Sequence, residues 1–127
     1  MPRTTISTPN APKAIGTYSQ AVKCGSTVYV SGQIPLDPAT AELVQGPMEV
    51  QVKRVFENLK SIVGAAGGSF AQVVKVTVYI LDFADFAALN KVMGEFFSEP
   101  YPARVTVQVA GLPRGARVEI DCVVELE

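Results

Sequence analysis

The sequence predicts an α+β fold in which one mixed β-sheet carries two helices packed on a single face. Short stretches rich in β-branched residues alternate with two longer stretches whose apolar residues recur at helical spacing. Their order along the chain is β-β-α-β-α-β-β, which is typical of a sheet with its helices gathered in one layer. The 127 residues are 48% hydrophobic, enough for one core, so we expect a single domain over residues 1–127.

The start of the chain is expected to form an irregular arm followed by two strands. Residues 1–16 contain three prolines and precede the first β-forming stretch, so we expect them to lack regular structure. Residues 17–24 and 27–32 are expected to pair as strands around a turn at Gly25-Ser26. The second of these stretches is rich in Val, Thr and Tyr, which favour a pleated backbone.

Two amphipathic helices are predicted in the middle of the chain. The first spans residues 48–66 and ends at Gly67-Gly68. Its apolar side comprises Val52, Val55, Phe56, Leu59, Ile62, Val63 and Ala66. The second spans residues 84–97 and is stopped by Pro100. Its apolar side comprises Phe86, Leu89, Met93, Phe96 and Phe97.

Three further strands complete the predicted sheet, at residues 72–81, 103–110 and 116–126. Because both helices are expected on one face, the other face is left uncovered. On that face we place Thr77, Tyr79, Arg104, Thr106, Gln108, Glu119, Asp121 and Val123. This set is too apolar for free solvent and too polar for a core, so we expect the face to contact another copy of the chain.

The distribution of charge argues against two classes of partner. The formal net charge is −1 and the 11 basic residues are scattered, so the sequence offers no footprint for nucleic acid or an anionic membrane. No stretch approaches the roughly 18 apolar residues that a membrane span requires. No apolar signal-peptide core follows Arg3, so we expect a cytoplasmic location.

The cysteine and histidine content limits the available chemistry. Cys24 and Cys122 are far apart, and we expect both to be free thiols, with Cys122 buried. Histidine is absent, which removes the usual general base of serine and cysteine hydrolases and the commonest transition-metal ligand. No metal-binding constellation is present in the sequence. Chemistry must therefore rely on carboxylates, arginine, hydroxyls, thiols, backbone groups and water.

Arg104 and Glu119 are the first candidates for that chemistry. Arg104 follows a Pro-x-Arg turn into a strand, where a guanidinium can bind a carboxylate through two parallel hydrogen bonds. A structural ion pair, for example with Glu119, is an equally good interpretation from the residues alone. Glu119 can orient or deprotonate a water molecule. Taken alone, it is better read as a solvated edge residue or as a partner of Arg104 or Arg117.

Four further residues carry weaker signals. Tyr18 can cap a pocket with its ring and hydroxyl, and Gly32 lets a ligand approach the backbone closely. Ser31 and Gly32 end a predicted strand, which by itself indicates only a turn. Asn90 falls among apolar residues of the second helix, where its amide needs hydrogen-bond partners. It either binds a ligand or fastens the helix to a neighbouring loop, and the residues alone favour the second role.

Several motifs match those of one known family in order and spacing. Residues 16–21 (Gly-Thr-Tyr-Ser-Gln-Ala) and 31–35 (Ser-Gly-Gln-Ile-Pro) resemble its N-terminal elements. The most specific motifs are residues 101–104 (Tyr-Pro-Ala-Arg), 112–113 (Leu-Pro) and 118–120 (Val-Glu-Ile). Over almost its entire length, the chain resembles the RidA/YjgF family of small imine deaminases.

The resemblance implies a fold, an assembly and a reaction. Members have a chorismate-mutase-like fold and form homotrimers in which the sheets surround a barrel-like centre. Their sites lie between subunits. They hydrolyse reactive 2-imino acids such as 2-iminobutanoate and 2-iminopropanoate to 2-oxo acids and ammonia, without a metal or other cofactor. The partners expected for this chain are therefore a small imino or oxo acid and two further copies of itself.

The resemblance also assigns roles to residues. Arg104 is expected to hold the substrate carboxylate, and Glu119 to position or activate the attacking water. The cleft is expected to be lined by Tyr18, Ser31, Gly32, Asn90 and Thr106. Of these, Thr106 is expected to contact the ligand chiefly through its backbone.

Two alternatives to the imine deaminase remain open. A trimer that senses small 2-oxo carboxylates without turnover needs Arg104 but not Glu119. An endoribonuclease, an activity sometimes attached to this family, is the weaker alternative because the chain is nearly neutral and lacks histidine.

Overall fold

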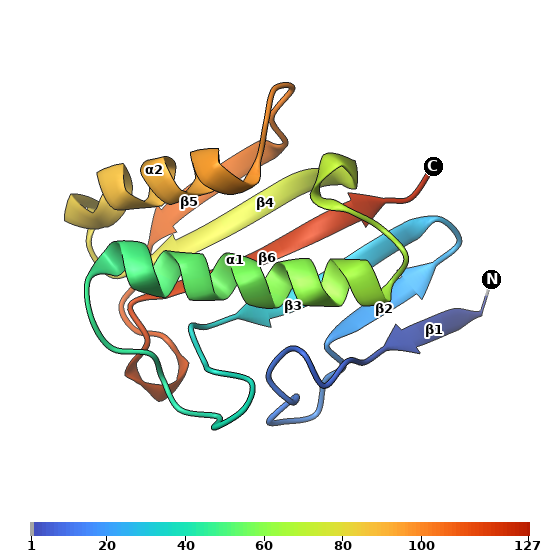
Figure 1. The fold of residues 1–127 in the computed structure, drawn as a ribbon, viewed down its shortest axis with the longest axis horizontal. Coiled ribbons are helices and arrows are strands. Elements are labelled where there is room, and N and C mark those ends of the chain that lie inside the picture. The colour runs from blue at the N-terminus through green and yellow to red at the C-terminus, as the bar shows by residue number, and fades with distance from the viewer. Residues whose placement is uncertain (1) are drawn as a thin grey trace.

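The computed structural model describes residues 2–127 and contains a six-stranded sheet with two α-helices (Figure 1). The strands are β1 (Arg3–Ile6), β2 (Ala21–Cys24), β3 (Thr27–Gln33), β4 (Val73–Ile80), β5 (Ala103–Gln108) and β6 (Val118–Glu125). The helices are α1 (Met48–Ala65) and α2 (Phe86–Phe96), and short 3-10 turns lie at η1 (Phe70–Gln72), η2 (Phe83–Asp85) and η3 (Pro113–Gly115). The order in the sheet is β1-β2-β3-β6-β4-β5, in which β4 and β5 are parallel and the other pairs antiparallel.

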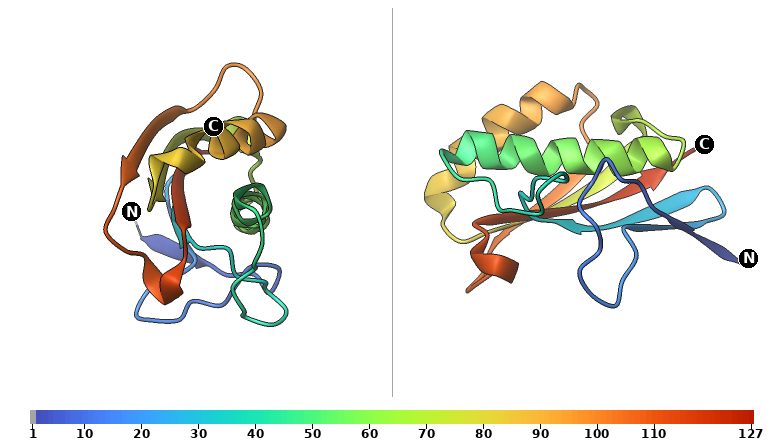
Figure 2. Two further views of the ribbon diagram at one scale, coloured as in Figure 1. Left: turned by 90° about the vertical axis from the view of Figure 1, so that its left-hand side faces the viewer. Right: turned by 60° about the horizontal axis from the view of Figure 1, so that its bottom comes forward.

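Both helices pack on the same face of the sheet, which confirms the predicted α+β class (Figure 2). The main core lies between the sheet and α1, because one side chain in two along β4 and β6 points toward the helix. An aromatic cluster of Phe56, Phe70, Phe96 and Phe97 joins α1 to α2 and to η1. The opposite face of the sheet carries no helix within residues 2–127.

Helix α1 has nearly its predicted boundaries. Gly67 adopts a φ of +91°, a conformation that favours glycine, and the Gly68 N–H donates to the Val63 carbonyl at 3.0 Å. Asn58 of α1 is fully buried, and its Nδ2 donates to the Leu36 carbonyl at 2.9 Å. The helix is thereby fastened to the loop that follows β3.

The N-terminal arm differs from its prediction in two respects. Residues 3–6 form strand β1, which pairs with β2, because the Thr-Thr-Ile segment is β-forming and lies before the later prolines. Residues 17–20, which were predicted as part of a strand over 17–24, do not belong to β2. The buried Gln20 side chain forms hydrogen bonds with the N-terminal arm. Its amide accepts a hydrogen bond from Thr8 N at 2.8 Å and donates to the Pro12 carbonyl at 2.8 Å.

The placement of Arg104, Thr106 and Gln108 on the uncovered face is wrong. Strand β5 runs in register with β4 so that Arg104 lies beside the core residue Val76, which puts all three on the helix-covered face. The valines between them face the other way and are 44% and 36% exposed. The prediction took the valines as inward-facing. At this edge Arg104 donates a hydrogen bond to Asn90 of α2, and Gln108 accepts one from Phe83 N of η2.

The rest of the uncovered face agrees with the prediction. Tyr79 lies opposite Glu119 and Thr77 opposite Asp121 in the β4–β6 pairing. The Tyr79 hydroxyl lies 3.2 Å from Asp121 Oδ2. Burial, together with the Asp121 carboxylate, raises the pKa of the Tyr79 hydroxyl.

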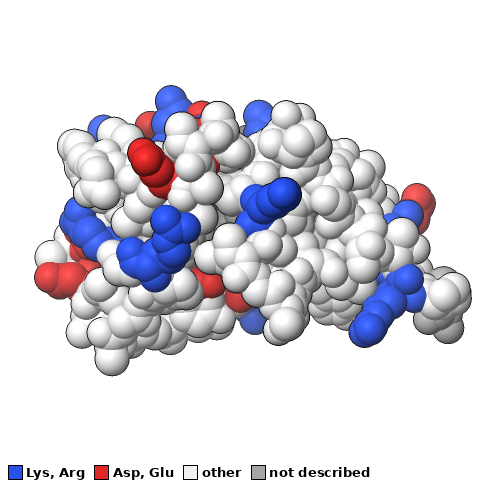
Figure 3. All heavy atoms as spheres, turned by 90° about the horizontal axis from the view of Figure 1, so that it is seen from below, with Lys and Arg blue, Asp and Glu red and all other residues white. Residues whose placement is uncertain are grey.

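Charges of both signs are interspersed on the face of the molecule that Figure 3 shows. The face shown in Figure 3 carries separate basic side chains with acidic ones between them, and no continuous basic band. Neither helix of the described chain has the length and apolar character needed to cross a bilayer.

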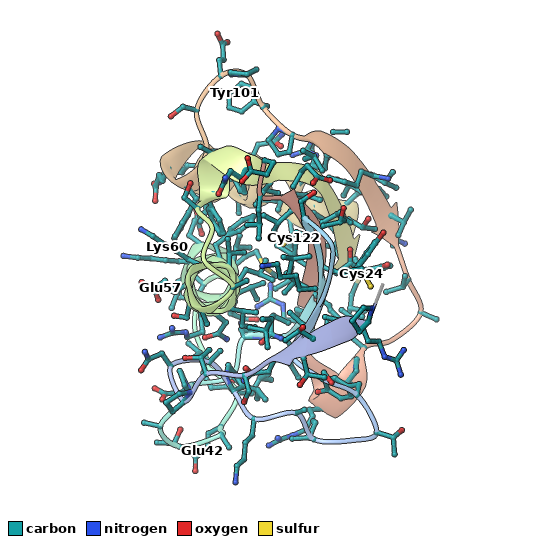
Figure 4. All side chains as sticks on the ribbon, turned by 90° about the vertical axis from the view of Figure 1, so that its right-hand side faces the viewer. Cys24, Glu42, Glu57, Lys60, Tyr101 and Cys122 are labelled. Carbon is teal, nitrogen blue, oxygen red and sulfur yellow. The ribbon has the colours of Figure 1, made fainter. Side chains whose placement is uncertain are left out.

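The two cysteines lie on opposite sides of the sheet (Figure 4). Both are free thiols, as predicted. Cys122 is buried in the core, where desolvation raises its pKa to about 12 and leaves it an inert apolar group.

Candidate active site

The Arg104 guanidinium is held against one stripe of α2. Its Nη1 donates to Asn90 Oδ1 at 2.7 Å and lies 3.6 Å from Met93 Sδ. Its carbon lies over the Phe86 ring, 5.3 Å from the ring centre. The adjoining pocket has a volume of about 320 Å³ and is lined by Asn90, Met93, Gly94, Tyr101, Pro102 and Arg104.

One edge of this guanidinium has no partner. Within residues 2–127, Nε and Nη2 of Arg104 make no hydrogen bond, and Arg104 forms no ion pair. An Nε–Nη2 edge matches the two oxygens of a carboxylate. The alternative of a structural ion pair with Glu119 is therefore not realised in the single chain. Arg117, the other candidate partner of Glu119, pairs with Asp85 at 3.6 Å.

Glu119 lies in a second pocket at the opposite face. This pocket has a volume of about 400 Å³. It is lined by Pro12, Lys13, Ile15, Tyr18, Ser31, Gly32, Gln33, Ile34, Leu36, Pro113 and Glu119. Burial, and secondarily the nearby Asp121, raises the pKa of the Glu119 carboxyl. A carboxylate with a raised pKa accepts a proton from water more readily than an ordinary surface glutamate.

The absence of a side chain at Gly32 makes room for the Glu119 carboxylate. A Cβ at position 32 would overlap the Glu119 carboxylate and lie 2.9 Å from its carbon Cδ. The Glu119 carboxylate occupies the space that a side chain at position 32 would need. The missing side chain lets the carboxylate rest on the β3 backbone.

Tyr18 and Ser31 build the wall beside Glu119. Ser31 Oγ donates to the Ser19 carbonyl at 2.6 Å, which ties β3 to the segment that carries Tyr18. The Tyr18 hydroxyl accepts a hydrogen bond from Ile15 N at 3.3 Å, and its ring is half exposed to the pocket.

The candidate residues fall into two separate groups. Tyr18, Ser31, Gly32 and Glu119 line one pocket, and Asn90 and Arg104 line the other; the two pockets share no residue. Thr106 lies on the Arg104 side, and its buried hydroxyl has no hydrogen-bond partner among residues 2–127. The single chain does not bring Arg104 and Glu119 together, because they project from opposite faces of the sheet.

The contacts of Arg104 with Phe86 and Met93 were not predicted from the sequence. Phe86 and Met93 were assigned only to the core, and Asn90 to a ligand or a loop. Their spacing of i, i+4 and i+7 places all three on one stripe of α2. This spacing, together with an arginine a short distance further along the chain, was the sequence signal that could have predicted these contacts.

Known proteins resemble this chain over nearly its full length. The endoribonuclease L-PSP family model matches residues 8–126. A Dermatophagoides farinae protein named 2-iminobutanoate/2-iminopropanoate deaminase is 52% identical over 126 residues, which are 99% of this chain and 98% of that protein. The crystal structure of RidA from an Antarctic Psychrobacter species has a TM-score of 0.93 and 55% identity, covering 96% of this chain and 98% of that one.

A further solved structure carries a bound small molecule. TdcF from E. coli, crystallised with bound serine, has a TM-score of 0.93 and 43% identity, covering 98% of this chain and 99% of that one. Family model, sequence relatives and solved structures thus agree over the same residues. The chain belongs to the RidA/YjgF family.

Proposed function

We propose that this protein is a cytoplasmic, cofactor-independent hydrolase that converts 2-iminobutanoate, 2-iminopropanoate and related 2-imino acids to 2-oxo acids and ammonia. The similarity to the Dermatophagoides farinae protein named 2-iminobutanoate/2-iminopropanoate deaminase supports the reaction class. The observation that carries the proposal is the pairing of chemical functions on one chain. Arg104 offers an unoccupied edge for a carboxylate, and Glu119 offers a carboxylate with a raised pKa.

We further propose that the complete site forms between neighbouring copies in a homotrimer. The two pockets lie on opposite faces, so the Arg104 pocket of one copy must meet the Glu119 pocket of another. The uncovered face supports such an assembly, since Tyr29, Val105 and Val107 are exposed there. A closed ring repeats the same contact at each junction.

In the proposed reaction, Arg104 binds the substrate carboxylate through Nε and Nη2. Glu119 removes a proton from a water molecule as its oxygen attacks C2 of the protonated imine. Glu119 returns this proton to the nitrogen of the resulting carbinolamine. The C–N bond then breaks as the hydroxyl oxygen forms the C=O bond of the oxo acid, and the hydroxyl proton passes through Glu119 to the departing ammonia, which leaves as ammonium. Tyr18 and Ser31 shape the cleft around the attacking water, and Gly32 seats Glu119.

Asn90 and Thr106 act on the carboxylate side of this site. Asn90 holds Nη1 of Arg104 and so leaves the opposite guanidinium edge to the substrate. Thr106 lies two residues further along the edge strand β5, whose outer backbone groups are unpaired within residues 2–127 and available to a ligand.

Arg104→Ala is expected to abolish deaminase activity, because the carboxylate then has no bidentate partner. The measurement is 2-oxo acid release from an imine generated by a dehydratase, compared with buffer alone. Arg117→Ala, which removes a partly exposed ion pair away from both pockets, should keep wild-type activity.

Three results would argue for other functions. Wild-type protein that releases no more product than buffer contradicts the deaminase. Binding of 2-oxobutanoate without turnover, unchanged in Glu119→Gln, indicates a sensor. Ribonuclease activity that survives repurification and is lost in Arg104→Ala indicates an RNA-directed enzyme.

Gly32→Ala is expected to reduce kcat/KM about as strongly as Glu119→Gln, because the added methyl group displaces the carboxylate. Gly64→Ala is the matched control. A Cβ at that position in the last turn of α1 meets no atom within 4 Å, so the protein should gain up to about 1 kcal/mol and keep its activity. Full activity of Gly32→Ala would show that the Glu119 position is not critical.

Activity is expected to fall as the pH drops through the raised pKa of Glu119, since only the carboxylate form accepts a proton. Asp121→Asn removes the negative charge that contributes to that shift, so the pKa of Glu119 should fall. The acid limb of the kcat/KM–pH profile should then move to lower pH. A limb that stays in place, or moves to higher pH, contradicts this role for Asp121.

A further inference from the structure

We propose that Phe86 is a positioning residue for Arg104, acting through the face of its ring on the guanidinium. The inference rests on the proposed function, in which Arg104 holds the substrate carboxylate. It concerns the direction in which the free guanidinium edge points. Its basis is the contact between the guanidinium carbon and the Phe86 ring, at 5.3 Å from the ring centre.

The contact is within the range of an energetically useful cation–π interaction, about 6 Å. Phe86 belongs to the same α2 stripe as Asn90 and Met93, so three chemically different groups meet one guanidinium. Asn90 supplies a hydrogen-bond acceptor, Met93 a polarisable sulfur and Phe86 a π face. These three side chains therefore surround one side of the Arg104 guanidinium.

The hydrogen bond to Asn90 cannot orient Arg104 alone. It fixes the position of Nη1 at 2.7 Å from Asn90 Oδ1, but the guanidinium plane can still turn about that bond. Such a rotation would swing the Nε–Nη2 edge away from the substrate. A ring lying under the plane opposes the rotation, since the cation then loses its contact with the π face.

The Phe86 ring is itself held in place. It is partly buried against the main core, and its centre lies 6.0 Å from that of Phe83. The aromatic cluster between α1 and α2 consists of other rings, Phe56, Phe70, Phe96 and Phe97. The contact with a charged group, rather than filling of that cluster, therefore distinguishes Phe86 from Phe96, the other phenylalanine of α2.

Pre-ordering of this kind affects ligand binding more than chemistry. An arginine whose orientation is set in advance loses less conformational freedom when the carboxylate binds. Removal of the ring should therefore weaken carboxylate binding and change kcat little. A ring that merely fills space would affect stability instead, and any apolar side chain of similar size would replace it.

The test compares Phe86→Leu with Phe86→Tyr. Leucine keeps apolar volume without a π face, whereas tyrosine keeps the ring. For Phe86→Leu we expect about a fivefold rise in both KM for 2-iminobutanoate and Kd for 2-oxobutanoate, with kcat within about twofold of wild type. Phe86→Tyr should retain the wild-type KM, Kd and kcat, because the ring is still present. Circular dichroism and thermal unfolding report whether each variant is folded.

Phe96→Leu is the matched control, because it removes a ring from the same helix that packs against Phe56 and does not contact Arg104. It should lower thermal stability and leave KM unchanged. In an Arg104→Lys background, Phe86→Leu should have a smaller effect, since the planar guanidinium is gone.

The outcomes separate this inference from the proposed function. An active wild type with equal KM and Kd values in Phe86→Leu overturns the positioning role alone. The same holds if the leucine and tyrosine variants are equally impaired, which would show a packing role. A wild type without deaminase activity overturns the proposed function, and the Kd for 2-oxobutanoate then still tests whether Phe86 orients Arg104.

Discussion

The parallel pairing of β5 with β4 sets the position of Arg104, and the separation of the Arg104 pocket from the Glu119 pocket depends on it. The register places Arg104 beside Val76, on the face that α2 covers. Glu119 belongs to β6 and projects from the other face. A shift of β5 by one residue would move Arg104 to the opposite face and replace it with a valine or alanine. This strand pairing therefore places the Arg104 pocket and the Glu119 pocket, which we propose to be the two parts of one site, on opposite faces of the chain.

The Arg104 pocket and the Glu119 pocket hold their charged groups in different ways. On the α2 side, a cation is accommodated by a hydrogen-bond acceptor, a sulfur and a ring, which leave one donor edge unused. On the β3 side, a carboxylate rests where Gly32 has no side chain, and its burial raises its pKa. Arg104 and Glu119 lie on opposite faces of the sheet and form no ion pair with each other within residues 2–127.

The sequence was a good guide to elements whose signal is local. The stripe of α1 and the alternation of β4 and β6 follow from burial against one core, and both appear as predicted. Strand β1 was missed because its residues gain regular structure only by pairing with β2. The face of Arg104 was missed because alternation on an edge strand gives two equivalent sets, and the apolar set was assumed to face inward.

Roles that depend on contacts between distant segments were the hardest to predict. The Gly32 position was singled out, but its partner is Glu119, which lies far along the chain on another strand. Asn90 was interpreted as a ligand-binding or loop-fastening residue, whereas its acceptor holds Arg104. In both cases the sequence indicated that a residue was unusual, and the pairing of strands determined which neighbour made it so.

The central claim is that one site combines Arg104 from one copy with Glu119 from another. The most direct measurement is the activity of mixed assemblies made from Arg104→Ala and Glu119→Gln subunits, each inactive alone. Random mixing of equal amounts in a cyclic trimer should restore about a quarter of wild-type activity per subunit, because each mixed ring contains one site with both intact residues. Mixed assemblies that form, as shown by differential tags, yet remain inactive would contradict the claim.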